Sequence, residues 1–187
     1  MKLRIMSVLI FCLLIAVAAL SAQDGSGGKV IISYTLERLE RRGSNQLAVW
    51  IESAGGQYIR TLFATNFMAR RKGFLIRPQC CPEWVKAAGL ASMTEAEIDA
   101  VSGATQKPGQ ITLAWDCTDA QGKRVSDGVY VYRIEGNLQW ENTVLWTGRI
   151  TVGIQPDASE AQAAYQPAGA EKVGRLVTEV HAAFRPD

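Results

Sequence analysis

The residues best suited to chemistry lie together between Asp99 and Thr105, in a segment that reads Asp-Ala-Val-Ser-Gly-Ala-Thr. Thr105 offers a hydroxyl nucleophile. The small residues Gly103 and Ala104 before it leave room for the backbone to approach a bulky phosphate. Asp99 adds a carboxylate that can orient an acceptor hydroxyl or a metal.

This segment resembles the Asp-x-x-Ser/Thr-Gly-Ala-Thr acceptor site of flavinylated electron-transfer domains. In those domains a flavin transferase attaches FMN through its phosphate to the last threonine. The resemblance implies that Thr105 is the attachment residue and that Asp99, Ser102 and Gly103 lie around the cofactor. It also implies a flavin transferase and membrane redox proteins as partners.

A structural interpretation of the same residues is the alternative. Asp99 to Val101 end a predicted helix, and Ser102-Gly103 is a natural C-terminal stop because glycine accepts the backbone angles found there. The chain from Ala104 to Pro108 then leads into a predicted strand. Flavin acceptor domains usually continue instead with a further hydroxyl residue and a helix. The sequence therefore favours a structural loop over a flavin site.

The cysteines Cys80, Cys81 and Cys117 lie beyond the N-terminal segment. In an oxidising compartment they predict one disulfide and one remaining thiol. A bond between adjacent cysteines is strained, so we expect Cys80 or Cys81 to pair with Cys117. A redox or metal site at Cys80-Cys81 is the alternative. The single histidine, His181, has no cysteine or carboxylate cluster beside it, so we expect neither a zinc site nor a Ser-His-Asp triad.

Residues 115–130 connect two predicted strands and are rich in turn residues. Asp116 and Asp119 are short acceptors that can close turns on nearby amides. Gly122 and Gly128 supply backbone angles that other residues resist. Calcium binding or acid–base chemistry by the two carboxylates is the alternative, but a turn network is the interpretation we favour.

Alternating apolar side chains predict strands along most of the chain, because neighbouring residues of a strand point to opposite faces. These strands are expected at residues 30–36, 47–52, 58–64, 110–115, 129–134, 143–146 and 149–152. Residues 46–64 should form a hairpin, and Gly148 a turn between the last two strands. Short strands at regular spacing predict a mainly β fold, an immunoglobulin-like antiparallel β-sandwich.

A small helical insert is predicted near residues 82–101, between the two halves of the sandwich. Thr94 is a suitable N-cap for its second helix, and Glu97 completes a capping-box pattern. Residues 155–169 are rich in Ala, Gln and Pro and predict a flexible link. Residues 171–184 carry apolar side chains at helical spacing, so we expect a C-terminal amphipathic helix that docks on the sandwich or on a partner.

Residues 115–130 resemble the immunoglobulin-like domain of flagellar hook-capping proteins, through Trp-Asp, Asp, Gly-Lys, Val and Gly-Val-Tyr in that order. More broadly, residues 30–153 resemble the predicted periplasmic family known as domain of unknown function 2271. The matching stretches are residues 48–52, 58–62, 99–105 and 115–130. Such sequences usually have glycine at the position of Cys117. The resemblance implies the sandwich fold but no established function.

The N-terminus has the features of a secretory signal peptide. Lys2 and Arg4 precede an apolar run that ends in small residues near Ala22, and the run is shorter than the roughly 20 residues of a spanning helix. We therefore expect cleavage near Ala22, a periplasmic or secreted chain and no membrane span afterwards. The expected domains are residues 1–22 as signal peptide, 23–29 as linker, 30–153 as sandwich, and 154–187 as link and helix.

The charge balance narrows the choice of partners. The chain has 20 Lys and Arg against 18 Asp and Glu, so loss of Lys2 and Arg4 with the signal peptide leaves it neutral. Nucleic acid binding needs a dense cationic surface and is not expected. The five tryptophans could line a carbohydrate groove, but core packing explains most of them.

No phosphate-binding loop, zinc spacing or nucleophile elbow is present in the sequence. We therefore expect a non-catalytic extracytoplasmic β-sandwich module for binding or protein interaction. It should need no cofactor or metal, and its partner would be another periplasmic protein. The alternative is an electron-transfer protein of the periplasm with FMN attached to Thr105.

Overall fold

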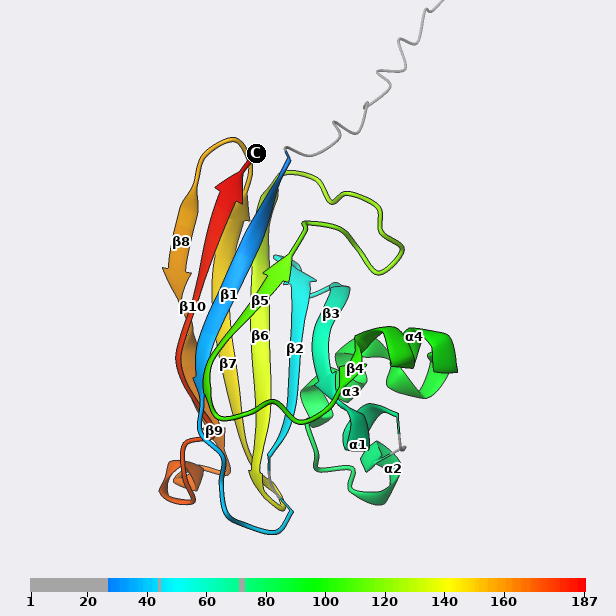
Figure 1. Cartoon of the computed structure of the whole chain (residues 1–187), viewed down its shortest axis with the longest axis vertical. Coiled ribbons are helices and arrows are strands. Elements are labelled where there is room, and N and C mark those ends of the chain that lie inside the picture. The colour runs from blue at the N-terminus through cyan, green and yellow to red at the C-terminus, as the bar shows by residue number, and fades with distance from the viewer. Residues whose placement is uncertain (1–26, 44, 71–72) are drawn as a thin grey trace, which may run out of the picture.

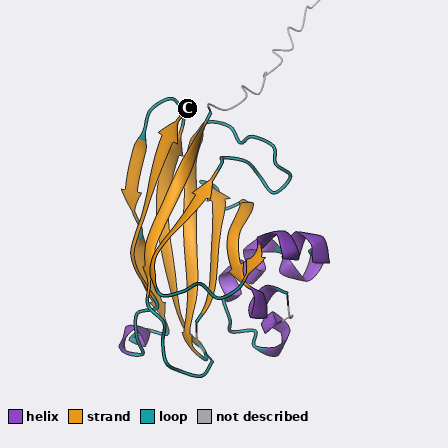
Figure 2. Cartoon of the chain, in the orientation of Figure 1, coloured by secondary structure: helices purple, strands orange, loops and turns teal. Residues whose placement is uncertain are grey.

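The computed structural model describes residues 27–43, 45–70 and 73–187. These residues form two packed sheets with a group of short helices at one side (Figures 1 and 2). One sheet has four strands in the order β5-β1-β10-β8, and the other has six in the order β4-β3-β2-β6-β7-β9. Neighbouring strands are antiparallel except for β3 and the short β4. The expected β-sandwich is therefore confirmed.

The strands of the four-stranded sheet are β1 (Gly28–Leu36), β5 (Gly109–Trp115), β8 (Asp157–Glu160) and β10 (Val177–Pro186). Those of the six-stranded sheet are β2 (Gln46–Ser53), β3 (Tyr58–Thr65), β4 (Ser102–Gly103), β6 (Gly128–Gln139), β7 (Asn142–Val152) and β9 (Gln162–Gln166). The helices are α1 (Asn66–Ala69), α2 (Gly73–Ile76), α3 (Pro82–Ala88) and α4 (Glu95–Val101), with 3₁₀ turns η1 (Leu90–Ser92) and η2 (Ala170–Lys172). The hairpin predicted at residues 46–64 corresponds to β2 and β3.

Strand β2 lies inside the six-stranded sheet and is buried on both faces. Val49 and Ile51 belong to the core between the sheets. Ala48 and Trp50 belong to a second core, which the same sheet forms with the helices. The alternation seen in the sequence therefore separates two hydrophobic cores, because successive strand residues point to opposite faces.

Most of the tryptophans are core residues, as expected. Trp50, Trp84 and Trp115 are completely buried, whereas Trp140 is 47% exposed. Truncating a buried tryptophan to alanine typically costs about 3–5 kcal/mol. These side chains are therefore major contributors to stability rather than a sugar-binding surface.

The helical insert lies between β3 and β5 and continues from α1 to α4. The predicted capping box is present in α4: the Glu97 amide donates to Thr94 Oγ1 at 3.3 Å, and the Thr94 amide donates to the Glu97 carboxylate at 2.7 Å. This reciprocal pair satisfies two amides that have no partner within the helix. From β4 the chain crosses to β5 and so joins the insert to the four-stranded sheet (Figure 1).

The turn predicted at Gly148 is wrong, because β7 runs unbroken from Asn142 to Val152. Gly148 pairs with Tyr132 on β6. A side chain at Gly148 would collide with the Tyr132 ring. The glycine therefore makes room for a neighbouring aromatic ring, a role that the sequence does not distinguish from a turn.

The flexible link and C-terminal helix predicted for residues 154–187 are also wrong. This segment contains β8, β9 and β10, and β10 pairs along β1. Val177 and Val180 are both buried although they are three residues apart. Between them, Glu179 has φ +54°, and the β1–β10 register shifts by one residue. Such a bulge adds a residue to one strand, so this strand imitates helical spacing.

Within the described residues, none of the helices is long and apolar enough to cross a membrane. The predicted signal peptide at residues 1–22 lies outside the described residues.

Candidate functional site

The chemistry-bearing segment runs from α4 through β4 into the loop before β5. Asp99 is exposed on α4 and forms an ion pair with Arg70, with Nε–Oδ1 at 2.8 Å and a second hydrogen bond from Nη2 to Oδ2 at 3.0 Å. Thr105 is exposed two residues after β4. The structure therefore leaves the Thr105 hydroxyl accessible and holds the Asp99 carboxylate on an arginine.

Gly103 has a packing role in this segment. β4 pairs in parallel with the end of β3, with Gly103 opposite Thr65. A Cβ at Gly103 would come within 2.9 Å of Cε2 of Phe63. The small residue therefore lets the loop lie against the ring. The neighbouring Ser102 Oγ is buried and has no hydrogen-bond partner within the described residues.

A small hollow lies beside Thr105 at the end of the sandwich. Its lining includes Leu36, Phe63, Leu176 and the polar Arg38. Its volume is about 10 Å³, and a cavity needs roughly 10–15 Å³ to hold one water molecule. The hollow is therefore too small for an organic ligand.

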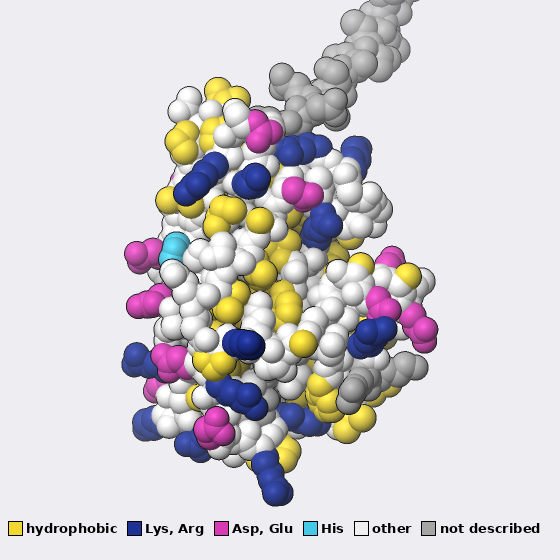
Figure 3. All heavy atoms as spheres, in the orientation of Figure 1, with side chains coloured by type: hydrophobic (Ala, Val, Ile, Leu, Met, Phe, Trp, Pro, Cys, Tyr) yellow, Lys and Arg dark blue, Asp and Glu magenta, His cyan; other side chains and the backbone are white. Residues whose placement is uncertain are grey.

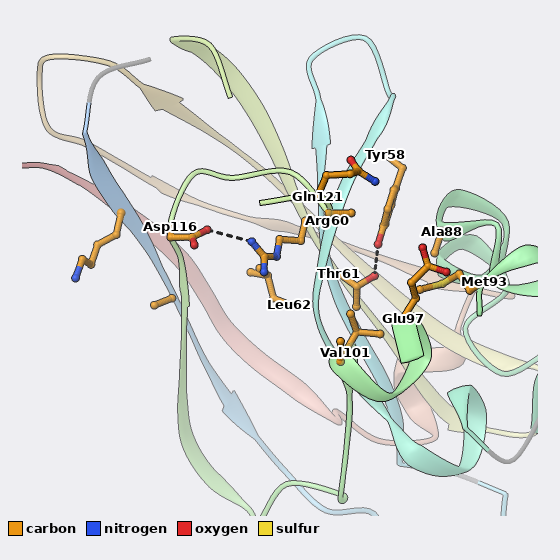
Figure 4. Close-up of a pocket in the computed structure, with 14 residues that line it drawn as sticks. Tyr58, Arg60, Thr61, Leu62, Ala88, Met93, Glu97, Val101, Asp116 and Gln121 are labelled. Carbon is orange, nitrogen blue, oxygen red and sulfur yellow. Dashed lines mark hydrogen bonds and ion pairs between the residues drawn. The ribbon is translucent and has the colours of Figure 1, made fainter. Parts of the chain in front are cut away.

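A larger groove of about 530 Å³ lies between β3, β5 and the helical insert (Figure 4). Figure 3 shows hydrophobic side chains along the middle of this face of the molecule. Apolar side chains lining the groove come from β3, the insert and β5, and include Leu62, Met93, Val101 and Ala114. Within the described part, β5 is the last strand of its sheet, and β3 pairs on this side only through Ala64 and Thr65. The groove therefore opens between two sheet edges.

One wall of the groove is fixed by a hydrogen-bonded chain. The indole N–H of Trp84 donates to Thr61 Oγ1 at 2.9 Å, and the Tyr58 hydroxyl is 2.8 Å from the same oxygen. Burial raises the pKa of the Tyr58 hydroxyl, and the hydrogen bond with Thr61 only partly offsets it. Tyr58 therefore stays protonated at neutral pH.

An ion pair joins β3 to the start of the loop after β5 in this groove. Arg60 Nη1 lies 3.3 Å from Asp116 Oδ1 and also bonds Thr118 Oγ1. Partial burial acts to raise the pKa of Asp116, but hydrogen bonds from Thr118 and the charge of Arg60 outweigh it and lower the pKa. The groove also contains Lys29 and Glu97. Its rim therefore carries two positive and two negative groups.

The carboxylates of the segment 115–130 form a turn network, as expected. Asp119 Oδ1 accepts from the amides of Gln121 at 3.0 Å and Lys123 at 2.9 Å. Cys117 has φ +56°, in the left-handed region that glycine adopts most readily. Among the described residues, no cluster of His, Cys, Asp and Glu could hold a metal ion.

The predicted disulfide is not formed: Cys80, Cys81 and Cys117 are free and buried thiols. Cys117 lies in the core between the sheets, and the other two lie in the core under the helices. The six-stranded sheet therefore separates the cysteines that sequence spacing seemed to pair. Burial raises the pKa of all three thiols.

Sequence reasoning missed Glu135, a charged residue in the middle of β6. It is 1% exposed, and its carboxylate accepts from the amides of Glu83 at 3.3 Å and Trp84 at 2.8 Å, at the start of α3. Burial raises its pKa to about 7. The one sequence feature that could have identified Glu135 is its position in a predicted strand, between the apolar Ile134 and the small Gly136.

The groove itself was also missed. Its side chains come from four separate parts of the chain: Lys29 and residues 58–62, 88–101 and 114–121. Only the packing of the insert against β3 brings them together. Asp99, Ser102, Gly103 and Thr105 are absent from the groove lining, although Ala100 and Val101 belong to it.

Comparison with known proteins places the chain in a family. Residues 30–171 match the model of a family described as a predicted periplasmic protein, domain of unknown function 2271. The match continues through β8 and β9, so the family's domain includes much of the segment that the sequence suggested was a link. No curated protein and no solved structure matches the chain. The family description confirms the expected periplasmic location. The chain belongs to the family of predicted periplasmic proteins known as domain of unknown function 2271.

Proposed function

We propose that this periplasmic domain is an electron-transfer module that carries FMN covalently on Thr105. The observation that carries the proposal is the setting of Thr105. Its side chain is exposed in the loop directly after β4, and β4 follows the helix whose Ala100 and Val101 line the groove. A transferase can therefore reach the hydroxyl. Residues that line a ligand-sized groove come four and five positions earlier in the sequence.

The neighbouring residues fit a phosphate-linked group. Gly103 packs against Phe63 where a Cβ would approach to 2.9 Å, so this position is kept small. The buried Ser102 Oγ lacks a partner in the described structure, which is costly unless a ligand or water satisfies it. The Asp99–Arg70 ion pair ties α4 to the chain after α1. Asp99, Ser102 and Gly103 of the motif thus each have a distinct setting around Thr105.

The attachment requires a donor that the protein does not contain. Thr105 Oγ would form a bond to the flavin-side phosphorus of a flavin dinucleotide, and the pyrophosphate P–O bond would break. The adenylate half leaves, and the hydroxyl proton passes to a base of the transferase. The Asp99 carboxylate already accepts two hydrogen bonds from Arg70, so the base is assigned to the transferase. The bound flavin would supply one- and two-electron transfer, which no side chain in the groove can provide.

Intact mass spectrometry tests this proposal directly. The chain should be expressed in the periplasm together with a flavin transferase, and the expected mass is that of the protein plus one FMN phosphodiester. Thr105→Ala should remove the addition completely. Thr112→Ala, an exposed threonine on β5, should leave it unchanged. An unmodified mass, with the transferase active on a known acceptor, would overturn the proposal.

The groove itself favours a second candidate function, reversible binding of a diffusible ligand. Its volume of about 530 Å³ lies within the range of roughly 300–1,000 Å³ that is usual for ligand pockets. In this case the protein would be a binding module without a cofactor. Native mass spectrometry of Thr105→Ala from the periplasm would then show a retained small molecule, which a groove-filling substitution removes.

A further inference from the structure

We infer that the groove between β3, β5 and α4 receives the isoalloxazine ring of a flavin attached at Thr105. This inference rests on the proposed function, but it concerns a different set of residues. It assigns the side chains of β3 and α4 as the environment of the ring, whereas the motif provides only the attachment point.

The sizes of the two spaces near Thr105 decide between them. The hollow that contains Thr105 in its lining has about 10 Å³ and is filled by a single water at most. The groove has about 530 Å³. Of these two spaces, only the groove is large enough for a tricyclic ring.

The chain path brings the attachment point within reach of the groove. Val101 lines the groove at the end of α4, and Thr105 follows four residues later. On β3, Leu62 lines the groove, and Thr65 is paired with Gly103. Three strand residues span roughly 10 Å at about 3.3 Å per residue. This length takes β3 from the groove to the level of Gly103, and Thr105 lies two residues further along the chain. The phosphodiester and ribityl chain must bridge this separation between the ring and Thr105.

The groove also offers the two environments that the ring needs. Apolar side chains lie on both sides of the groove, with Leu62 beside Arg60 and Met93 beside Glu97, and can contact the ring (Figure 4). The pyrimidine end carries carbonyl oxygens and needs hydrogen-bond donors. Arg60 contacts Asp116 and Thr118 through Nη1, and its Nε and Nη2 protons remain as donors. Gln121 adds a neutral amide to the lining, near Tyr58 (Figure 4).

Iodide quenching of flavin fluorescence tests whether the ring is in the groove. Pockets bury roughly 70–90% of a ligand's surface, so the quenching constant of the flavinylated protein should be about three- to tenfold below that of free FMN. Ala100→Phe fills the groove from α4 and should raise the constant toward the free value. Ala96→Phe is the matched control, since Ala96 is exposed on the same helix and lies outside the groove.

A second variant keeps the test valid if Ala100→Phe does not fold. Arg60→Gln should shift the flavin absorption maximum and lower its midpoint potential, because a positive charge near the ring favours the reduced form. Arg149→Gln, on the exposed face of β7, should change neither. Flavinylated protein with a quenching constant equal to that of free FMN overturns the groove assignment alone. Protein without added FMN mass overturns the proposed function instead.

Discussion

The indole N–H of Trp84 donates to Thr61 Oγ1 at 2.9 Å, and this bond joins the helical insert to the strand that forms one wall of the groove. Both residues are buried, with Trp84 fully enclosed and Thr61 3% exposed. The Tyr58 hydroxyl shares the same oxygen. The position of α3 and the orientation of the groove's aromatic side chain therefore depend on one threonine.

Removing this bond should destabilise the domain. Trp84→Phe keeps an aromatic ring but deletes the donor, and the loss of a buried hydrogen bond with some packing should cost about 1–3 kcal/mol of unfolding free energy. Urea denaturation followed by circular dichroism measures it. Trp140→Phe is the control, because Trp140 is 47% exposed, and it should cost less than about 0.5 kcal/mol. Equal losses in the two variants would contradict a role for the Trp84–Thr61 bond.

Gly103→Ala should disturb the pairing of β4 with β3. The new Cβ would approach Phe63 Cε2 at 2.9 Å, and overpacking of this kind typically costs about 1–3 kcal/mol. The variant should also be flavinylated more slowly, since the loop carrying Thr105 is displaced. Both effects are read from urea melts and from the time course of the mass addition.

A compensating substitution separates this clash from other causes. Phe63→Leu in the Gly103→Ala background should recover most of the lost stability, because it removes the atom that the new methyl meets. Gly55→Ala serves as a control, since its Cβ would meet only Ser53 Oγ at 3.8 Å. If the double variant is no more stable than the single one, the contact with Phe63 does not explain the glycine.

Local periodicity predicted most of the strands, because burial on one or both faces leaves a clear pattern. It failed at Val177 and Val180, where the bulge at Glu179 places residues three apart on one face. It also failed at Gly148, whose partner Tyr132 is 16 residues away in sequence. Both errors depend on contacts across strands, which a single segment does not contain.

Part of the candidate site could be predicted from the sequence and part could not. Asp99 to Thr105 stand out in the sequence because the motif is continuous. The groove residues, such as Arg60 and Val101, come from separate elements and meet only after folding. The cysteine pairing failed for a related reason: sequence spacing does not reveal that β2 separates Cys117 from Cys80 and Cys81.

Glu135 should make stability depend on pH. Its pKa of about 7 in the folded protein lies above the ordinary value of 4.5, so the folded state binds the proton more tightly than the unfolded chain. Stability from this group is full below about pH 4.5 and is lost as pH rises towards 7. The difference corresponds to on the order of 3 kcal/mol. Two charges also act on it: Glu83 raises the pKa, and Arg133 lowers it.

Paired titrations isolate this contribution. Glu135→Gln keeps an acceptor for the Trp84 amide but does not titrate, so its unfolding free energy should fall less than that of the wild type between pH 5 and 7. Glu160→Gln, at an exposed position on β8, should follow the wild type. Parallel curves for wild type and Glu135→Gln would show that Glu135 is already ionised in this range.

The three thiols should remain free in the protein despite the oxidising periplasm. Alkylation of a chain without residues 1–22, under denaturing and non-reducing conditions, should add a label to each of Cys80, Cys81 and Cys117. In the native state, labelling near pH 8 should be slow, because all three side chains are buried and burial raises the pKa of Cys117 to about 11. Its rate should follow unfolding and rise in Trp84→Phe. A single label with a mass two hydrogens lower would show that a disulfide forms, and that the two cores are arranged differently around β2.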